Sequence, residues 1–330
     1  MRQVNILGVN LGGWLIVEQW LTPSVFAGLA ARDEWELSQT EQGRERIRQH
    51  RQTFITEADF RWLRDNDVTH VRLPVPYWAI GDADGYVSAH KELAWAMRMA
   101  ETYGIQVLLD LHAAPGGQNI YDHSGRRGQM EWFDRSHQER TLTLLMTLAT
   151  TYRDSPALWG IELLNEPDVQ GRTWQLIRFY RRAYKQLRAV MRPGTYTVFH
   201  DGFAPLWMTG SLYARRRYPV AMDVHWYAFE LPRRLSWTRY LGWSQSMRKW
   251  MLRLFGIWQP VIVGEWSGVL PQRFFDECSH DRHRELLREN LSMQQVAYAR
   301  ALQSYYWTYK AEGEGMWHFR SLVEKAALSR

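Results

Sequence analysis

Ile161-Glu162-Leu163-Leu164-Asn165-Glu166-Pro167 and Val261-Ile262-Val263-Gly264-Glu265-Trp266 share one sequence pattern. Each is an apolar run of strand length that ends in a glutamate. Buried parallel strands read as continuous Val, Ile and Leu, and the first polar residue after such a run marks its carboxyl end. In a (β/α)8 barrel these ends meet at one face, where catalytic side chains gather. We therefore expect Glu166 and Glu265 to face each other across the mouth of a barrel.

Strand-like and helix-like segments alternate along the rest of the chain. The expected strands are 6–12, 69–74, 105–112, 158–165, 195–200, 221–225, 260–265 and 303–308. Amphipathic helical stretches are expected near 57–66, 91–103, 137–153, 172–191, 205–212, 236–256, 281–301 and 317–327. Eight βα units in sequence favour a closed parallel barrel, an α/β TIM barrel, over an open doubly wound sheet.

We expect residues 1–330 to form a single domain, since no linker, repeat or low-complexity tract divides them. The connection 18–55 is long for a βα loop and predicts an insertion over the barrel mouth. The connection 113–136 is also long and belongs to the same face, where loops commonly shape a pocket. Leu11-Gly12-Gly13-Trp14 has the wrong spacing for a dinucleotide fingerprint. We expect no cofactor.

Basic residues slightly outnumber acidic ones, with 41 Lys and Arg against 35 Asp and Glu and a net charge of +6. Much of the excess lies in the clusters 44–48, 215–217 and 233–234. Clusters of this kind usually form solvated surface. Since no nucleic-acid-binding motif accompanies them, we do not expect nucleic acid as a partner.

The segment 236–258 combines aromatic side chains, such as Trp243 and Trp250, with basic ones, such as Arg239 and Lys249. An aromatic face beside a basic face can lie on an anionic membrane. An outer barrel helix is amphipathic as well, because one of its faces packs on the barrel. We favour the second interpretation and keep membrane-surface contact as the minor one.

Cys278 is the single cysteine, so no intramolecular disulfide can form. The first residues show none of the regions of a signal peptide. No apolar run approaches the ~20 residues that a membrane span needs. The sequence therefore predicts a cytoplasmic protein, or a secreted one if a signal peptide has been removed.

Polar and aromatic side chains stand at the ends of six expected strands. They are Arg72, His112, Asn165 with Glu166, His225 with Tyr227, Glu265 and Trp307. Two carboxylates that face each other across a barrel mouth are the equipment of a glycosidase. One such glutamate alone would be read as a structural acid that caps a helix, but two of them with these partners indicate an active site.

A set of motifs in a fixed order gives the chain a family resemblance over nearly its whole length. The set comprises Gly8-Val9-Asn10-Leu11-Gly12-Gly13-Trp14 and the stretches 22–24, 33–35, 71–78, 110–119, 161–167, 264–267 and 306–310. With these motifs the chain resembles the retaining (β/α)8 enzymes of glycoside hydrolase family 5, and among them the exo-β-1,3-glucanases. The resemblance implies release of glucose from the non-reducing end of β-1,3-glucan or a related β-glucoside.

Roles for five residues follow from this resemblance. Glu166 matches the acid/base of the family and Glu265 its nucleophile. Arg72 would donate a hydrogen bond to Glu265 and keep it ionised, because a nearby positive charge favours the carboxylate. His225 and Tyr227 would orient the two glutamates. The sequence also predicts that Pro167 forces Glu166 into an extended conformation.

The same resemblance places five residues around the terminal glucose. Asn165 would hold the sugar 2-OH, His112 would bind another hydroxyl, and Trp307 would form the floor. Glu18 and Asp122 match acids that close the pocket of exo-acting relatives. Their presence argues for exo action over a cleft that is open at both ends.

The sequence identifies only one residue of an aromatic pair that would contact the next sugar. Tyr121 is placed like one half of an aromatic clamp on the next sugar. For the other half, Phe229 is one position off and Glu230 occupies the matching position. His123 stands where these relatives carry an amide.

Other functions remain open on the sequence alone. A transglycosylase, an endo-β-glucanase or a hydrolase of glycolipid or aryl β-glycosides would use the same residues. A non-catalytic carbohydrate-binding barrel is disfavoured because both glutamates and Arg72 are present. A metal-dependent hydrolase is disfavoured because His280 and His283, the nearest histidine pair, do not form a His-Glu-x-x-His pattern. We expect no metal.

Overall fold

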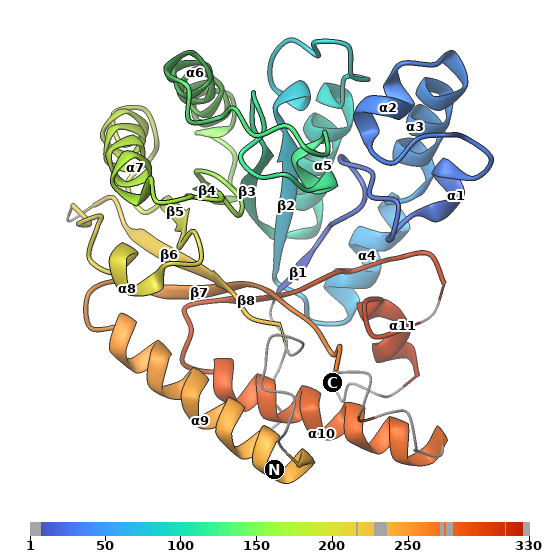
Figure 1. Ribbon diagram of the computed structural model, residues 1–330, viewed down its shortest axis with the longest axis vertical. Coiled ribbons are helices and arrows are strands. Elements are labelled where there is room, and N and C mark those ends of the chain that lie inside the picture. Colours follow the sequence, from blue (N-terminus) through green and yellow to red (C-terminus); the bar gives the residue numbers. More distant parts are fainter. Residues whose placement is uncertain are drawn as a thin grey trace.

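The computed structural model describes residues 8–215, 217–227, 236–270, 274, 280–313 and 315–325. Eight parallel strands pair in chain order and close into a barrel (Figure 1). The strands are β1 Gly8–Asn10, β2 His70–Pro76, β3 Gln106–Ala113, β4 Leu158–Glu162, β5 Tyr196–His200, β6 Val220–His225, β7 Val261–Trp266 and β8 Ser304–Tyr306. The fold is the predicted (β/α)8 TIM barrel in a single domain.

Strands β1 and β8 form the seam that closes the barrel, with Gly8 paired to Tyr305 and Val9 to Tyr306. The register shifts between Val224 and His225 where β6 meets β7, so that His225 pairs with Glu265. Such irregularities re-aim side chains and are frequent beside active sites. His225 and Glu265, which this shift pairs, were both predicted to belong to the site.

The barrel interior changes from apolar to polar toward the carboxyl ends of the strands. Side chains alternate between the two faces of a strand, so residues two apart share a face. Leu108, Val198, Ala221, Ile262 and Tyr305 form a buried apolar cluster inside the barrel. Two positions further along β3 and β6 lie Asp110 and Asp223, which are fully buried acids.

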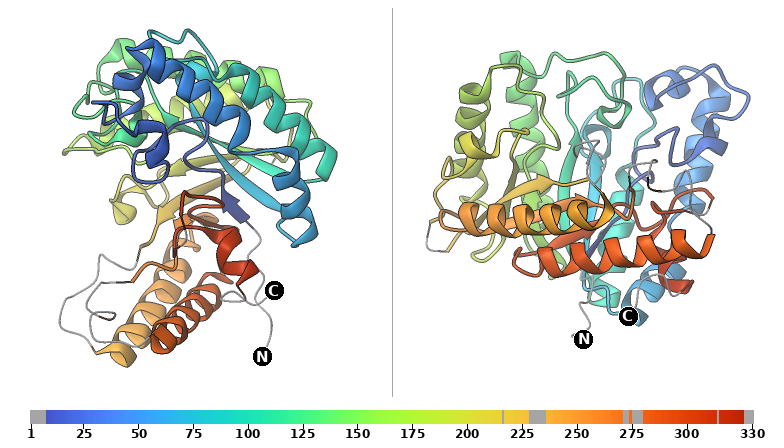
Figure 2. Two further views of the ribbon diagram at one scale, coloured as in Figure 1. Left: turned by 90° about the vertical axis from the view of Figure 1, so that its right-hand side faces the viewer. Right: turned by 60° about the horizontal axis from the view of Figure 1, so that its bottom comes forward.

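An outer layer of helices surrounds the strands (Figure 2). It consists of α4 Glu57–Asp65, α5 His90–Tyr103, α6 Arg135–Tyr152, α7 Thr173–Leu187, α8 Pro205–Met208, α9 Trp237–Phe255, α10 His280–Tyr298 and α11 Phe319–Glu324. Each lies where the sequence predicted a helix, although α8 is only four residues long. Gly104 ends α5 with a φ of +68°, a conformation that glycine adopts without strain.

The predicted insertion after β1 contains three further helices, α1 Pro23–Phe26, α2 Glu34–Ser38 and α3 Glu41–Thr53. A buried ion pair between Arg51 and Glu34, 2.5 Å long, joins α3 to α2. Asp33 Oδ2 accepts a hydrogen bond from the backbone N–H of Arg127 at 2.9 Å. The insertion therefore contacts the long loop after β3, which contains the short helix η2 Asp122–Ser124.

Helix α9 lies beside α10, as Figures 1 and 2 show. Arg248 of α9 donates to Gln294 of α10 at 2.9 Å, and Tyr240 of α9 is buried. Trp243 and Trp250 are exposed on the same helix. In the described part of the chain, no helix combines the length and the apolar character that crossing a membrane requires. Membrane-surface contact through 236–258 stays a prediction.

Candidate active site

A cavity of about 480 Å³ opens at the carboxyl ends of the strands. It is lined by Glu18, Trp20, His112, Tyr121, Asp122, His123, Asn165, Glu166, Phe203, Tyr227, Glu265, Trp307 and Trp317. Nine of these residues were predicted from the sequence. The two remaining predicted residues, Arg72 and His225, are buried and hydrogen-bonded to the lining glutamates.

Arg72 is completely buried at the centre of the site. Its Nε and Nη2 donate to the two oxygens of Glu162 at 2.8 and 3.2 Å. Its Nη1 donates to Glu265 Oε1 at 3.0 Å, and its Nη2 donates to Asn165 Oδ1 at 2.8 Å. Asp110 Oδ2 lies 3.0 Å from Nη2. One guanidinium thus joins acids of β3, β4 and β7, as its planar set of donors allows.

Glu265 accepts hydrogen bonds from two sides. Arg72 donates to Oε1 at 3.0 Å, and the hydroxyl of Tyr227 donates to Oε2 at 2.6 Å. Burial raises the pKa of Glu265, while the charges of His225 and Arg72 and the Tyr227 hydroxyl act in the opposite direction. The predicted contact between Arg72 and Glu265 is present. Both oxygens of the carboxylate are held in fixed positions.

Glu166 lies in the loop after β4, and the prediction that it is extended is wrong. Its φ of +41° falls in the left-handed region. Strand β4 has already ended at Glu162, and Asn119 Nδ2 donates to the carbonyl oxygen of Glu166 at 3.0 Å. Tertiary contacts of this kind override the local preference of a residue before proline, and strained backbone is frequent at active sites.

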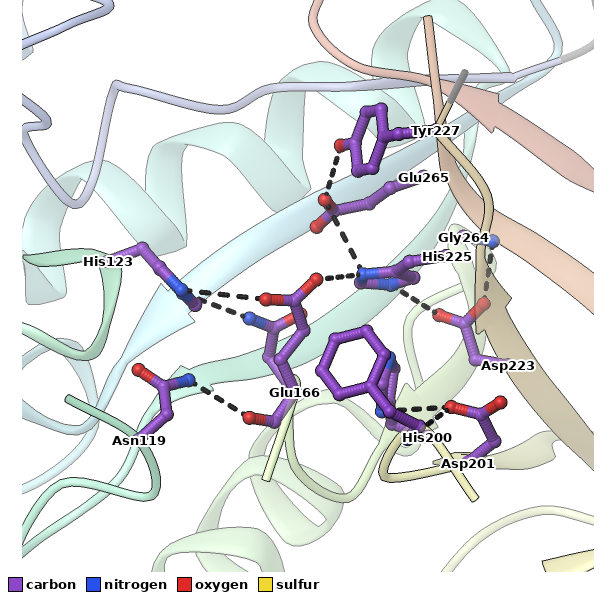
Figure 3. A network of polar contacts seen from close by, with 12 residues as sticks. Asn119, His123, Glu166, His200, Asp201, Asp223, His225, Tyr227, Gly264 and Glu265 are labelled. Atoms are coloured by element: carbon purple, nitrogen blue, oxygen red, sulfur yellow. Dashed lines mark hydrogen bonds and ion pairs between the residues drawn. The ribbon is translucent and has the colours of Figure 1, made fainter. Parts of the chain in front are cut away.

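His225 links the two glutamates, and Figure 3 shows both carboxylates pointing toward it. Its Nδ1 lies 2.6 Å from Glu166 Oε1 and 3.5 Å from Glu265 Oε2. Its Nε2 lies 3.3 Å from Asp223 Oδ2. Burial alone would lower the pKa of His225, but the charges of Glu265 and Asp223 raise it well above its ordinary value. This direction favours the imidazolium form of His225, in which both nitrogens donate.

The proton on His225 also determines the state of Glu166. Burial would raise the pKa of Glu166, yet the hydrogen bond from His225 and the charge of that ring hold it well below its ordinary value. In the free site Glu166 is a carboxylate. A proton lies one short hydrogen bond away, on His225.

The inner end of the pocket carries an aromatic floor and two polar side chains. The rings of His112 and Trp307 stack at 5.6 Å with an angle of 8°. Gly12 leaves room for this floor, because a Cβ at that position would lie 2.8 Å from the Trp307 ring. Asp110 accepts from His112 Nδ1 at 2.6 Å, and Asn165 Nδ2 lies 3.5 Å from His112 Nε2. These contacts fix the ring orientation of His112.

Glu18 and Asp122 lie on the wall formed by the insertion and the loop after β3. Glu18 Oε2 accepts from Trp20 Nε1 at 2.9 Å, and Asp122 Oδ2 accepts from Arg127 Nη2 at 3.0 Å. Burial and the charge of Asp122 raise the pKa of Glu18 well above its ordinary value. Both acids line the same cavity.

The outer part of the pocket contains Tyr121, whose side chain is exposed. Its ring stacks on His123 at 5.5 Å. His123 Nε2 lies 3.5 Å from Glu166 Oε2, and His123 Nδ1 lies 3.3 Å from Asn165 Nδ2. Phe229 and Glu230, the two residues considered at the position of the other half of the clamp, lie outside the described residues.

Sequence reasoning missed two groups of site residues. Asp110, Glu162 and Asp223 surround Arg72, and their signal was available, since each is the single acid of a mostly apolar strand. Trp20, Phe203 and Trp317 line the pocket from loops. Loop residues carry no periodic pattern, so only the folded chain shows where they lie.

Among the described residues, two groups of three side chains bring potential metal ligands within 4.8 Å of one another. The groups are Glu166, His200, His225 and Glu162, Asp223, His225. Both include His225, whose two nitrogens already contact Glu166 and Asp223. These hydrogen bonds account for the positions of the side chains, and we assign no step to a metal ion.

The model of a known protein family, cellulase (glycosyl hydrolase family 5), matches residues 34–313. The chain belongs to glycosyl hydrolase family 5. It is therefore an enzyme that hydrolyses β-glycosides, and its substrate is a carbohydrate. The residues at the strand ends, such as Glu166 and Glu265, belong to the motifs that gave the sequence its resemblance to family 5.

Curated relatives of this chain include proteins named as probable glucan 1,3-beta-glucosidases. The chain is 37% identical to a probable glucan 1,3-beta-glucosidase A of Emericella nidulans, over 81% of this chain and 68% of that protein. It is 32% identical to a protein of the same name from Aspergillus fumigatus, over 96% of this chain and 86% of that protein. A crystal structure of rutinosidase from Aspergillus niger has the same fold, with a TM-score of 0.83, 22% identity and 99% of each chain covered.

Proposed function

We propose that this enzyme is a retaining exo-β-glucosidase that releases glucose from the non-reducing end of β-1,3-glucan or a related β-glucoside. The observation that carries the proposal is the pair Glu166 and Glu265, which share His225 Nδ1 at 2.6 and 3.5 Å. Because both oxygens contact this nitrogen, the distance between Glu166 Oε1 and Glu265 Oε2 cannot exceed the sum of these two distances. This limit is compatible with the roughly 5–5.5 Å between the carboxyl groups of retaining enzymes.

In the first step Glu265 attacks the anomeric carbon and the bond to the leaving oxygen breaks. Arg72 and Tyr227 hold the attacking carboxylate by both of its oxygens. The product is a glucosyl ester of Glu265. The leaving oxygen takes a proton from Glu166 and departs as an alcohol.

Glu166 must receive a proton before it can give one, because its pKa lies well below the ordinary value in the free site. His225 Nδ1, at 2.6 Å, is the adjacent source of that proton. A bound leaving group displaces water around Glu166 and favours the neutral carboxylic acid. In the second step Glu166, now a carboxylate, takes a proton from water, which attacks the ester and frees Glu265.

The exo mode rests on Glu18 and Asp122, which stand beside the inner end of the pocket. Carboxylates accept charge-assisted hydrogen bonds from sugar hydroxyls. We expect these two acids to close the pocket around one terminal glucose. The names of the two relatives support a β-1,3-linked glucan as substrate. Transglycosylation, endo cleavage and cleavage of glycolipid or aryl β-glycosides would use the same two glutamates.

Azide products from two alanine variants test the assignment of the glutamates. In Glu265→Ala, azide enters the vacated face in one inversion, so a β-glucoside gives α-glucosyl azide. In Glu166→Ala, an activated aryl glucoside still forms the ester, and azide then gives β-glucosyl azide. The reverse pattern, or full hydrolysis by Glu265→Ala without azide, would overturn the assignment. Product analysis on laminari-oligosaccharides with the unmodified enzyme separates exo from endo cleavage and hydrolysis from transfer.

A further inference from the structure

Phe203 follows β5 at the mouth of the barrel and lines the pocket. Its side chain is 55% exposed, although it is large and apolar. Its φ is +56°, in the left-handed region that side-chain-bearing residues rarely adopt. An exposed phenylalanine in a strained conformation gains little from folding. Strain of this kind persists where a site needs a side chain in one position.

Buried groups hold the turn that presents Phe203. Asp201 Oδ1 accepts from the backbone N–H of Phe203 at 2.9 Å. His200 Nδ1 accepts from the backbone N–H of Gly202 at 2.9 Å, and the carbonyl of Asp201 accepts from Ala204 at 3.0 Å. The ring of Phe203 meets that of His200 edge-on at 5.1 Å. His200 and Asp201 are themselves buried, so three successive N–H groups are fixed from below.

This turn lies on the Glu166 side of the pocket. The rings of His200 and His225 meet at 4.4 Å, and His225 contacts Glu166 at 2.6 Å (Figure 3). The acid must stand beside the oxygen that it protonates. The group attached to that oxygen therefore lies on the same side as Phe203. The glucose that is cleaved off occupies the inner end, over Trp307.

We propose that Phe203 is a substrate-binding residue on which the ring next to the scissile oxygen stacks, an inference that rests on the proposed function above. An aromatic face suits any ring with a flat apolar surface, whether an aryl group or the C–H face of a second sugar. Tyr121, exposed on the loop after β3, also lines the pocket. Phe203 thereby sets the preference for the leaving group, while the glucose site sets the preference for the sugar.

The experiment compares three substrates that carry the same glucose. β-Glucosyl fluoride has no ring on the leaving side, 4-nitrophenyl β-glucoside has an aryl ring, and laminaribiose has a sugar ring. The variants are Phe203→Ala and Phe203→Tyr. Alanine is as strained as phenylalanine at a positive φ, so Phe203→Ala removes the ring without relieving the backbone. Trp207→Ala is the matched control, because Trp207 lies in the short helix α8 that follows this turn and is 67% exposed but does not line the pocket.

We expect Phe203→Ala to lower kcat/KM about tenfold on one or both ring substrates, and to leave glucosyl fluoride unchanged. Phe203→Tyr and Trp207→Ala should resemble the unmodified enzyme. A loss on the aryl glucoside only identifies an aryl partner, and a loss on laminaribiose only identifies a sugar. Equal losses on all three substrates, or no loss on any, overturn the inference. If the unmodified enzyme cleaves none of the three, the proposed function fails and the inference fails with it.

Discussion

The carboxylate of Asp223 occupies the position in the barrel interior where a side chain of residue 264 would lie. Asp223 Oδ1 accepts a hydrogen bond from the backbone N–H of Gly264 at 2.6 Å. A Cβ built on Gly264 would lie 1.9 Å from Asp223 Oδ2, which is closer than a carbon and an oxygen that are not bonded can approach. The same Oδ2 lies 3.3 Å from His225 Nε2. The glycine before the proposed nucleophile therefore makes room for the acid that supports His225.

We predict that Gly264→Ala lowers kcat/KM on 4-nitrophenyl β-glucoside by at least about a hundredfold. The added methyl group must displace Asp223, and His225 then loses the charge that helps to keep it protonated beside Glu166. Gly242→Ala in α9 is the control, because a Cβ there meets nothing within 4 Å. Activity of Gly264→Ala equal to that of Gly242→Ala would show that Asp223 can move without consequence.

The second prediction concerns the buried pair of Arg72 and Glu162. Arg72→Met should lower the free energy of unfolding by about 3–5 kcal/mol, because it leaves buried carboxylates without their cation. Adding Glu162→Gln should recover part of that loss, since one unpaired carboxylate is then gone. Urea unfolding measures both effects. Arg192→Met, which removes an exposed pair with Asp154, should change the free energy by less than about 1 kcal/mol. A double variant no more stable than Arg72→Met would contradict this account.

Asp122→Ala tests whether the pocket is closed around one glucose. Removing the carboxylate leaves sugar hydroxyls unpaired and should cost about 1–3 kcal/mol of binding, which corresponds to a drop in glucose release of about five- to 150-fold. Chromatography of laminarihexaose digests measures the rate and the products. Glucose release at the original rate, or products consisting mainly of internal fragments, would replace the exo assignment with an endo one.

His50 makes stability depend on pH in a predictable direction. Its Nε2 lies 2.7 Å from the carbonyl of Gly13, and burial lowers its pKa to about 4. The unfolded chain binds a proton near pH 6.5, whereas the folded one stays neutral down to about pH 4. The stabilisation is therefore complete above pH 6.5 and is lost as the pH falls toward 4, by up to about 3 kcal/mol.

Urea unfolding between pH 7 and 4 checks the contribution of His50. His50→Gln keeps a donor for Gly13 but does not titrate, so its unfolding free energy should fall less with pH than that of the unmodified protein. His90→Gln, at an exposed position at the start of α5, is the control for the substitution itself. The same slope in His50→Gln as in the unmodified protein would exclude His50 as the source.

The sequence was sufficient for the barrel because eight strand-like segments alternate with amphipathic helical stretches. Hydrophobic periodicity located each helix of the outer layer, and the strand ends located Arg72, Glu166 and Glu265. Strand limits were less certain, since β4 stops at Glu162 rather than at Asn165. The backbone N–H groups of Leu163 and Asn165 still donate to Val198 and Leu111. The chain then turns into a loop in which Asn119 holds the carbonyl of Glu166, a contact between distant segments.

The loops were beyond the reach of sequence patterns. The insertion was predicted as a segment, but its three helices and the contact of Asp33 with Arg127 depend on how two loops meet. The left-handed turns at Glu166 and Phe203 oppose local preference and are stable only because buried neighbours hold them. Such positions are where a functional site departs from what its own segment would favour.

The seam between β1 and β8 has a consequence for the order of events during protein synthesis. Gly8 pairs with Tyr305, and Asn10 Nδ2 donates to the carbonyl of Gly264 at 2.8 Å. The first strand therefore emerges from the ribosome long before the strands that it must contact. Until residue 307 has been added, the sheet has an open edge and the glucose site has no floor. Activity should appear only on chains that have been completed and have closed, and a nascent chain needs protection from aggregation until then.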